Sequence, residues 1–126
     1  EKVRRMLLDI QRGIFPGLPL VAEGRDMGTV VFPSAEIKFF IEAPIELRIK
    51  RRMEQMRRNK KLSESELKLL KEKMQIEIAE RDFRDKTREI SPTIPAKDAI
   101  IIDNSCQTLT EVVEKMYDFV AKRRLL

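Results

Sequence analysis

The sequence predicts an α/β fold in which a parallel sheet is flanked by helices. Three short apolar runs of strand length, near residues 20–23, 37–43 and 99–103, alternate with segments of helical periodicity. The second run is almost continuously apolar, as expected for a strand that is buried on both faces of a parallel sheet. With 126 residues the chain is long enough for one domain with its own core.

The helices follow from apolar spacing and from their end signals. Pro44 suits the start of one helix, and Ser63 with Glu66 three residues later forms a capping box at the start of another. That second helix is expected to end near Glu89, because Ser91 and Pro92 follow it. The expected helices cover residues 1–12, 45–59, 63–89 and 108–125.

Composition excludes several classes of protein. The single Cys106 rules out an internal disulfide framework, and the absence of His removes the common zinc sites and the His-based catalytic triads. No apolar run approaches the roughly 20 residues of a membrane helix, and no secretory signal is present. We therefore expect a cytoplasmic protein with no protein-held metal. The chain has 26 basic and 21 acidic residues. This mild basic excess is compatible with binding of a nucleic acid or of a phosphorylated small molecule, or with a role in solubility alone.

A charged pair, Arg25 and Asp26, follows the first predicted strand between Gly24 and Gly28. Opposite charges released into a tight turn at a strand end can fix a ligand at the edge of a parallel sheet. The alternative is a turn whose glycines supply unusual backbone angles while both charges sit in water.

The end of the long helix carries a second charged group. Arg81, Asp85 and Arg88 are spaced i, i+4 and i+7, so they share one face, and two guanidiniums beside a carboxylate can hold a phosphate and a diol. The alternative is an exposed ladder of ion pairs, Glu77 with Arg81 and Glu80 with Arg84.

A third group is the run of basic residues around Arg48, Arg51 and Arg52, which continues to Lys61. Phosphoryl transfer needs positive charge around the migrating group, so mobile arginines over a phosphate site are one reading of this run. A solvated helix face is the other.

Several blocks, in order along essentially the whole chain, resemble a bacterial-type cytidylate kinase. The most specific is GRDMGTVVFP over residues 24–33, and the others are RIKRR over 48–52, RDFRDKTR over 81–88 and PTIPAKDA over 92–99. The resemblance implies a P-loop nucleoside monophosphate kinase fold that transfers the γ-phosphoryl group of ATP, with Mg²⁺, to CMP or dCMP.

The resemblance also implies roles for individual residues. Asp26, helped by Arg4, corresponds to the carboxylate that reads the cytosine base. Arg25 and Arg88 correspond to residues that bind the CMP phosphate. Arg81 and Asp85 correspond to residues that bind the sugar. Arg48 and Arg52 correspond to catalytic arginines of a lid over ATP, and the lid is expected near residues 52–66.

The sequence departs from the family pattern in three places. Ser34 stands where Asp is usual, residues 19–20 look like a small insertion, and no Gly precedes a Lys as in the phosphate-binding P-loop. We therefore expect residues 1–126 to be the C-terminal part of a single cytidylate kinase domain, inactive when alone.

The expected partners are CMP or dCMP and ATP, with no membrane and no nucleic acid. The intact enzyme is expected to be monomeric, whereas a fragment with an open sheet edge would self-associate. Two alternatives remain: a nucleotide-binding fragment without turnover, and a basic nucleic-acid-binding module, although the basic run lacks interleaved aromatic residues.

Overall fold

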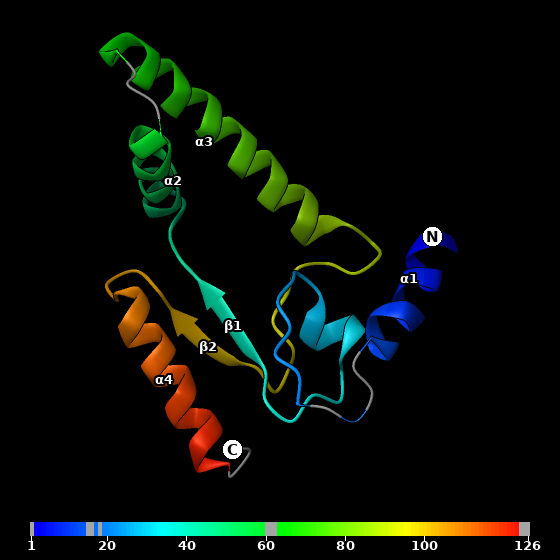
Figure 1. Ribbon diagram of the computed structural model, residues 1–126. Helices are drawn as coiled ribbons and strands as arrows, with labels where there is room; N and C mark the ends of the chain where they lie inside the picture. Colours follow the sequence, from blue (N-terminus) through cyan, green and yellow to red (C-terminus); the bar gives the residue numbers. More distant parts are fainter. Residues whose placement is uncertain (1, 15–16, 18, 60–62, 124–126) are drawn as a thin grey trace.

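The protein is described by a computed structural model that covers residues 2–14, 17, 19–59 and 63–123. Two parallel strands lie at its centre, with helices on either side and a long helical arm above them (Figure 1). In chain order the elements are α1 (Lys2–Gly13), the π-helical turn η1 (Met27–Val31), β1 (Phe39–Glu42), α2 (Ile45–Asn59), α3 (Glu64–Thr87), β2 (Ile100–Asp103) and α4 (Leu109–Lys122).

The sheet places two different surfaces back to back. Phe40 of β1 pairs with Ile101 of β2, and because side chains alternate along a strand, their neighbours point to the opposite face. On that opposite face α4 packs against the sheet, where the ring of Phe119 meets Phe39 edge to face at 6.1 Å. Ile102 is fully buried. The core therefore lies between the sheet and α4, and the Phe40 face is left for the site.

The prediction of a strand near residues 20–23 is wrong for this structure. These residues form an irregular segment, and Val21 is 99% exposed. A short apolar run forms a strand only where a neighbouring strand satisfies its backbone hydrogen bonds, and the structure pairs nothing with this run among the described residues. β1 and β2 fall within the other two predicted ranges but are shorter than predicted.

The helix boundaries follow the local signals closely. The predicted capping box is confirmed: the Ser63 hydroxyl accepts from the Glu66 backbone N–H, and the Glu66 carboxylate accepts from the Ser63 backbone N–H at 2.8 Å. α3 ends at Thr87 rather than Glu89, because Arg88 already has an extended backbone. α4 ends at Lys122, and residues 124 and 125 of the predicted helix lie outside the described residues.

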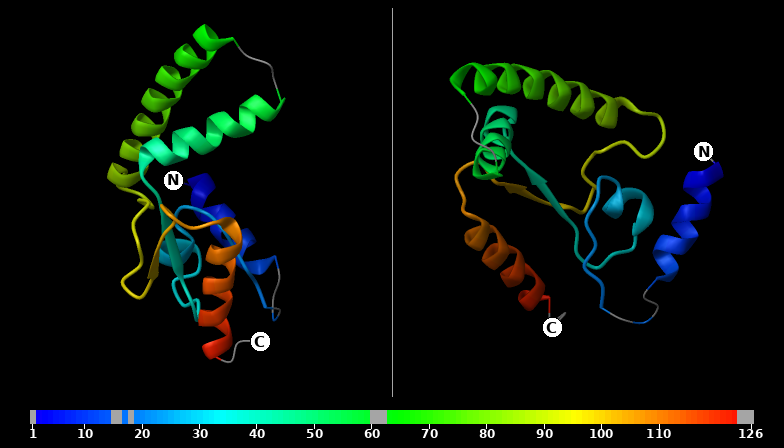
Figure 2. Two further views of the ribbon diagram at one scale, coloured as in Figure 1. Left: turned by 90° about the vertical axis from the view of Figure 1, so that its left-hand side faces the viewer. Right: turned by 45° about the horizontal axis from the view of Figure 1, so that its top comes forward.

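α2 leads away from the sheet and α3 returns toward it (Figure 2), and the hydrogen bond between Arg48 and Asp82 joins the first turn of α2 to the last turns of α3. Each helix buries one apolar side chain, Ile49 in α2 and Met74 in α3. The predicted lid near 52–66 spans the outer part of this arm and includes residues 60–62, which lie outside the described residues. Its role as a lid stays a prediction.

Candidate functional site

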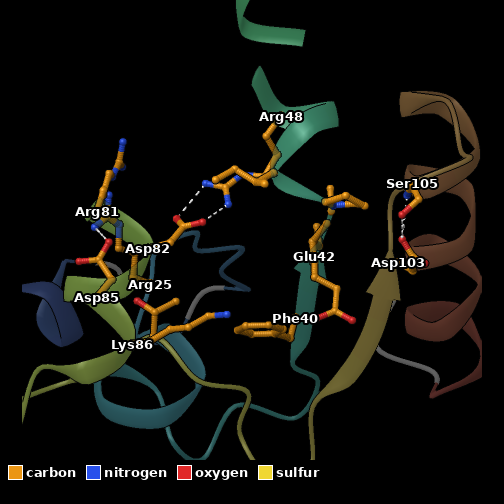
Figure 3. A pocket seen from close by; sticks show the side chains of 15 residues that line it. Arg25, Phe40, Glu42, Arg48, Arg81, Asp82, Asp85, Lys86, Asp103 and Ser105 are labelled. Atoms are coloured by element: carbon orange, nitrogen blue, oxygen red, sulfur yellow. Dashed lines mark hydrogen bonds and ion pairs between the residues drawn. The ribbon is translucent and has the colours of Figure 1, made fainter. Parts of the chain in front are cut away.

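A cavity of about 720 Å³ opens where the carboxyl end of β1, the start of α2 and the last turns of α3 meet (Figure 3). Ligands of α/β proteins usually bind at this edge of a parallel sheet. Phe40 and Glu42 form its floor on the β1 side, and Asp103 and Ser105 lie at the end of β2. The opposite wall carries the charged side chains of Arg25, Arg81, Asp82, Asp85 and Lys86, and Arg48 enters the cavity from α2.

Asp85 is the centre of this charged wall. One of its oxygens accepts a hydrogen bond from Arg25 Nη1, and the other lies 3.7 Å from Arg88 Nη1. The Asp85 side chain is only 13% exposed, so both cations meet a largely desolvated carboxylate. Two guanidiniums from distant parts of the sequence are thereby held together, in a geometry that suits a doubly charged phosphate.

Arg81 lies one helical turn before Asp85 and lines the same cavity. The alternative ladder pairs, Glu77 with Arg81 and Glu80 with Arg84, are not formed in the part of the chain that the structure describes. Glu77 instead lies 3.8 Å from Lys73. The geometry thus favours a site at the end of α3 over a solvated ladder.

The loop after α3 is fixed by the same residues. The Arg88 Nε–H donates to the carbonyl of Ser91, and the Thr93 N–H donates to the Asp85 carbonyl at 2.7 Å. Ser91 is buried and has a φ of 54°, in the left-handed region that a residue with a side chain rarely adopts. Thr93 lines the cavity, and its hydroxyl oxygen is buried without a hydrogen-bond partner among the described residues.

Arg48 reaches the cavity from the first turn of α2. Its two terminal nitrogens bind the two oxygens of Asp82 on α3, with Nη2 3.0 Å from Oδ1. The hydrogen bond with Asp82 raises the pKa of Arg48 above its ordinary value, so the guanidinium stays charged. Asp82 was not among the residues predicted for the site. Its position three residues before Asp85, on the same side of a helix, is the signal that could have found it.

Four predicted residues do not line this cavity: Arg4, Asp26, Arg52 and Arg88. Arg52 is exposed and contacts Gln55 at 3.3 Å. Arg4 donates to the carbonyl of Ile90 at 3.4 Å and, together with Arg88, lines a second hollow of about 380 Å³. Asp26 is half-buried in front of η1 and does not line either cavity.

The turn around Asp26 is organised by the backbone. The Asp26 carbonyl accepts from the N–H groups of Val30 and Val31 at 2.9 and 3.1 Å, which sets the π-helical turn. Gly24 and Gly28 do not have positive φ values, contrary to the alternative that assigned them unusual backbone angles. A side chain at Gly24 would come within 2.5 Å of Met27, so the glycine allows a close approach instead.

The described residues contain no cluster of three or more His, Cys, Asp or Glu side chains that could hold a metal ion. None of the described helices is both long enough and apolar enough to span a membrane.

A parallel sheet whose carboxyl edge opens on an arginine-lined cavity defines an α/β protein suited to an anionic ligand. Residues 1–122 match the cytidylate kinase family, and the chain belongs to that family. The resemblance drawn from the sequence blocks is thereby confirmed.

Relatives from three bacteria agree with this assignment. The chain is 40% identical over 122 residues to cytidylate kinase 1 of Haemophilus influenzae, a match that covers 97% of this chain and 50% of the relative. It is 42% identical to cytidylate kinase of Vibrio cholerae, with 97% and 52% covered, and 39% identical to that of Thermotoga maritima, with 98% and 53% covered. The chain therefore spans about half the length of the curated relatives it matches.

Proposed function

We propose that this chain forms the acceptor side of a nucleoside monophosphate kinase that transfers the γ-phosphoryl group of ATP to CMP or dCMP. The observation that carries the proposal is the pairing of Arg25 and Arg88 with Asp85, which lines the cavity together with Arg25, Arg48 and Arg81. Family membership supplies the reaction class, and the cavity supplies cations for the phosphates.

In this proposal Arg25 and Arg88 bind the phosphate of CMP. Both already contact Asp85, one at each carboxylate oxygen, so both guanidiniums are partly ordered before a phosphate binds. Asp85 and Arg81 then hold the sugar, since a carboxylate accepts hydrogen bonds from sugar hydroxyls. The charge of the bound phosphate offsets the repulsion between two neighbouring guanidiniums.

In the same proposal Asp26 recognises the cytosine base, and Arg4 helps to bind it. An ionised carboxylate accepts from the amino group of cytosine and repels the carbonyl that uracil presents at the same position. The Asp26 side chain makes no hydrogen bond with the described residues, so it is available for this contact. Because it lies outside the cavity, the base has to extend from the cavity toward η1.

The donor nucleotide is assigned to the arginines of α2. Arg48 lines the cavity, and Arg52, one turn farther along, reaches it only if the arm moves. Mg²⁺ would arrive with the ATP phosphates, and the described residues do not fit a protein-held metal site.

The P-loop of this fold has no counterpart in these 126 residues. Its backbone N–H groups and Lys normally cradle the ATP phosphates, so we expect the 126 residues alone to bind ATP poorly and to lack turnover. The proposed fold is thus a P-loop α/β kinase, of which this chain is one part, acting in the cytoplasm.

The test is phosphoryl transfer from ATP by the complete natural polypeptide that carries this sequence. We expect CMP and dCMP to be converted to their diphosphates, and UMP to be used far less well. Equal use of all three nucleotides, or no transfer to any of them, contradicts the proposal. A nucleic-acid-binding module would instead show salt-dependent binding to single strands.

A further inference from the structure

We propose that Asp82 is a positioning residue that holds Arg48 at the cavity while leaving part of its guanidinium free for a phosphate. The inference rests on the proposed function, in which Arg48 meets the phosphates of ATP. It concerns a residue to which neither the sequence blocks nor the family assignment gave a role.

The geometry is a two-point contact between the two helices of the arm. Arg48 Nη2 lies 3.0 Å from Asp82 Oδ1, and Arg48 Nη1 binds Asp82 Oδ2. Both side chains line the cavity and stay partly open to it, at 40% and 33% exposure (Figure 3). A two-point contact fixes the plane of the guanidinium as well as its position.

The contact with Asp82 leaves some N–H donors of the Arg48 guanidinium free. Arginine carries five N–H donors, and a fork with one carboxylate engages one donor on each terminal nitrogen. The Nε–H and one N–H on each terminal nitrogen remain. Arg48 can therefore bind Asp82 and an anionic ligand at the same time.

Arg52 shows what the same side chain does without such a partner. It lies four residues after Arg48 on the same helix, contacts only Gln55 among the described residues, and does not line the cavity. The difference between the two arginines follows the carboxylate on α3. Holding Arg48 before the ligand arrives removes the cost of ordering a long side chain from the reaction step.

Asp82 also opposes phosphate binding, because its negative charge cancels part of the attraction from Arg48. Orientation and attraction therefore change in opposite directions when the carboxylate is removed. Since phosphoryl transfer depends on positioning as much as on charge, we expect the loss of orientation to dominate in the transition state. The effect should then appear in kcat more than in KM.

The experiment uses the complete natural polypeptide and compares Asp82→Asn, Arg48→Ala and the double variant. We expect Asp82→Asn to lower kcat for CMP phosphorylation by about tenfold, with the KM for CMP within about twofold of wild type. Asp82→Glu, which keeps the carboxylate, should recover part of the rate. In the Arg48→Ala background, Asp82→Asn should have no further effect, because its action passes through Arg48.

The matched control is Asp118→Asn, which removes the same charge from an exposed position on α4 and should leave kcat unchanged. Thermal melting of each variant identifies any loss of folding. If Asp82→Asn does not fold, Asp82→Ser, which also removes the carboxylate, takes its place. A lower kcat in the wild-type background, with no further loss in the Arg48→Ala background, supports the inference, and a wild-type kcat overturns it.

The possible failures are distinguishable. A wild-type enzyme that does not phosphorylate CMP overturns the proposed function. An active wild type whose Asp82→Asn variant has the same kcat overturns only the role of Asp82. A loss of equal size with and without Arg48 also overturns it, because Asp82 would then act by another route.

Discussion

Asp26 and Asp85 are two carboxylates of the proposed acceptor site, and they differ in burial and in their side-chain contacts. Asp85 is largely buried and binds Arg25 and Arg88, whereas the Asp26 side chain makes no hydrogen bond with the described residues. Asp85 is therefore held in place by the protein itself. Asp26 is positioned only through its backbone, and its carboxylate stays free to read a ligand.

The largest expected effect comes from breaking the Asp85 cluster. Asp85→Ala leaves two guanidiniums without their shared carboxylate, and Arg88→Ala removes a phosphate ligand. In the complete natural polypeptide each should reduce kcat/KM for CMP by about 1.5–3 kcal/mol of transition-state stabilisation. Steady-state kinetics measure this, with Asp118→Asn as control. Wild-type kcat/KM in both variants would mean that the cluster is only structural.

A somewhat smaller effect is expected at Asp26, and it should change selectivity rather than overall binding. Asp26→Asn can turn its amide to donate where the carboxylate accepted, so CMP loses a partner and UMP gains one. The preference for CMP over UMP should fall by about 1–3 kcal/mol. The ratio of kcat/KM values for the two nucleotides measures it. An unchanged ratio would place Asp26 in the turn alone.

The smallest effects are expected at the helix caps, which lie away from both carboxylates. Ser63→Ala and Thr108→Ala each remove a capping hydroxyl and should lower the free energy of unfolding by about 1 kcal/mol. Chemical denaturation of the complete natural polypeptide measures this. In the complete natural polypeptide, kcat/KM for CMP should not change with either variant. A kinetic effect comparable to that of Asp85→Ala would contradict the separation between caps and site.

The cap of α4 also makes a prediction about pH. Hydrogen bonds from the Thr108 backbone and side chain lower the pKa of Glu111, so its contribution to stability is present above its ordinary pKa of 4.5. That contribution is lost as pH falls through the lower pKa of the folded state. Wild type should thus be more stable than Glu111→Gln near neutral pH, and the two should converge in acid. Denaturation curves from pH 7 down to pH 3 test the convergence.

Local signals predicted the fold better than they predicted the partners of each element. The capping box at Ser63 and the apolar run of β1 depend on neighbouring residues, and both appear where the sequence places them. The run at 20–23 has the same apolar character, yet a strand also needs a paired neighbour, which its sequence does not reveal. Strand formation is the less local property, and there the prediction was wrong.

The same distinction applies to the site. Helical spacing placed Arg81 and Asp85 on one side of α3, and the structure puts both at the cavity. The contacts of Asp85 with Arg25 and of Asp82 with Arg48 span 60 and 34 residues, and periodicity carries no information about such distances. Ser91 was read only as a helix stop, although its left-handed backbone shapes the loop that Arg88 holds.

The most direct test of the central claim is a crystal structure of the complete natural polypeptide with CMP. The account predicts the CMP phosphate within hydrogen-bond distance of the Arg25 and Arg88 guanidiniums, and the sugar hydroxyls on Asp85. The amino group of cytosine should lie toward Asp26. CMP bound elsewhere, with the Arg25–Asp85 pair unchanged and no ligand atom in contact with Asp85, would contradict it.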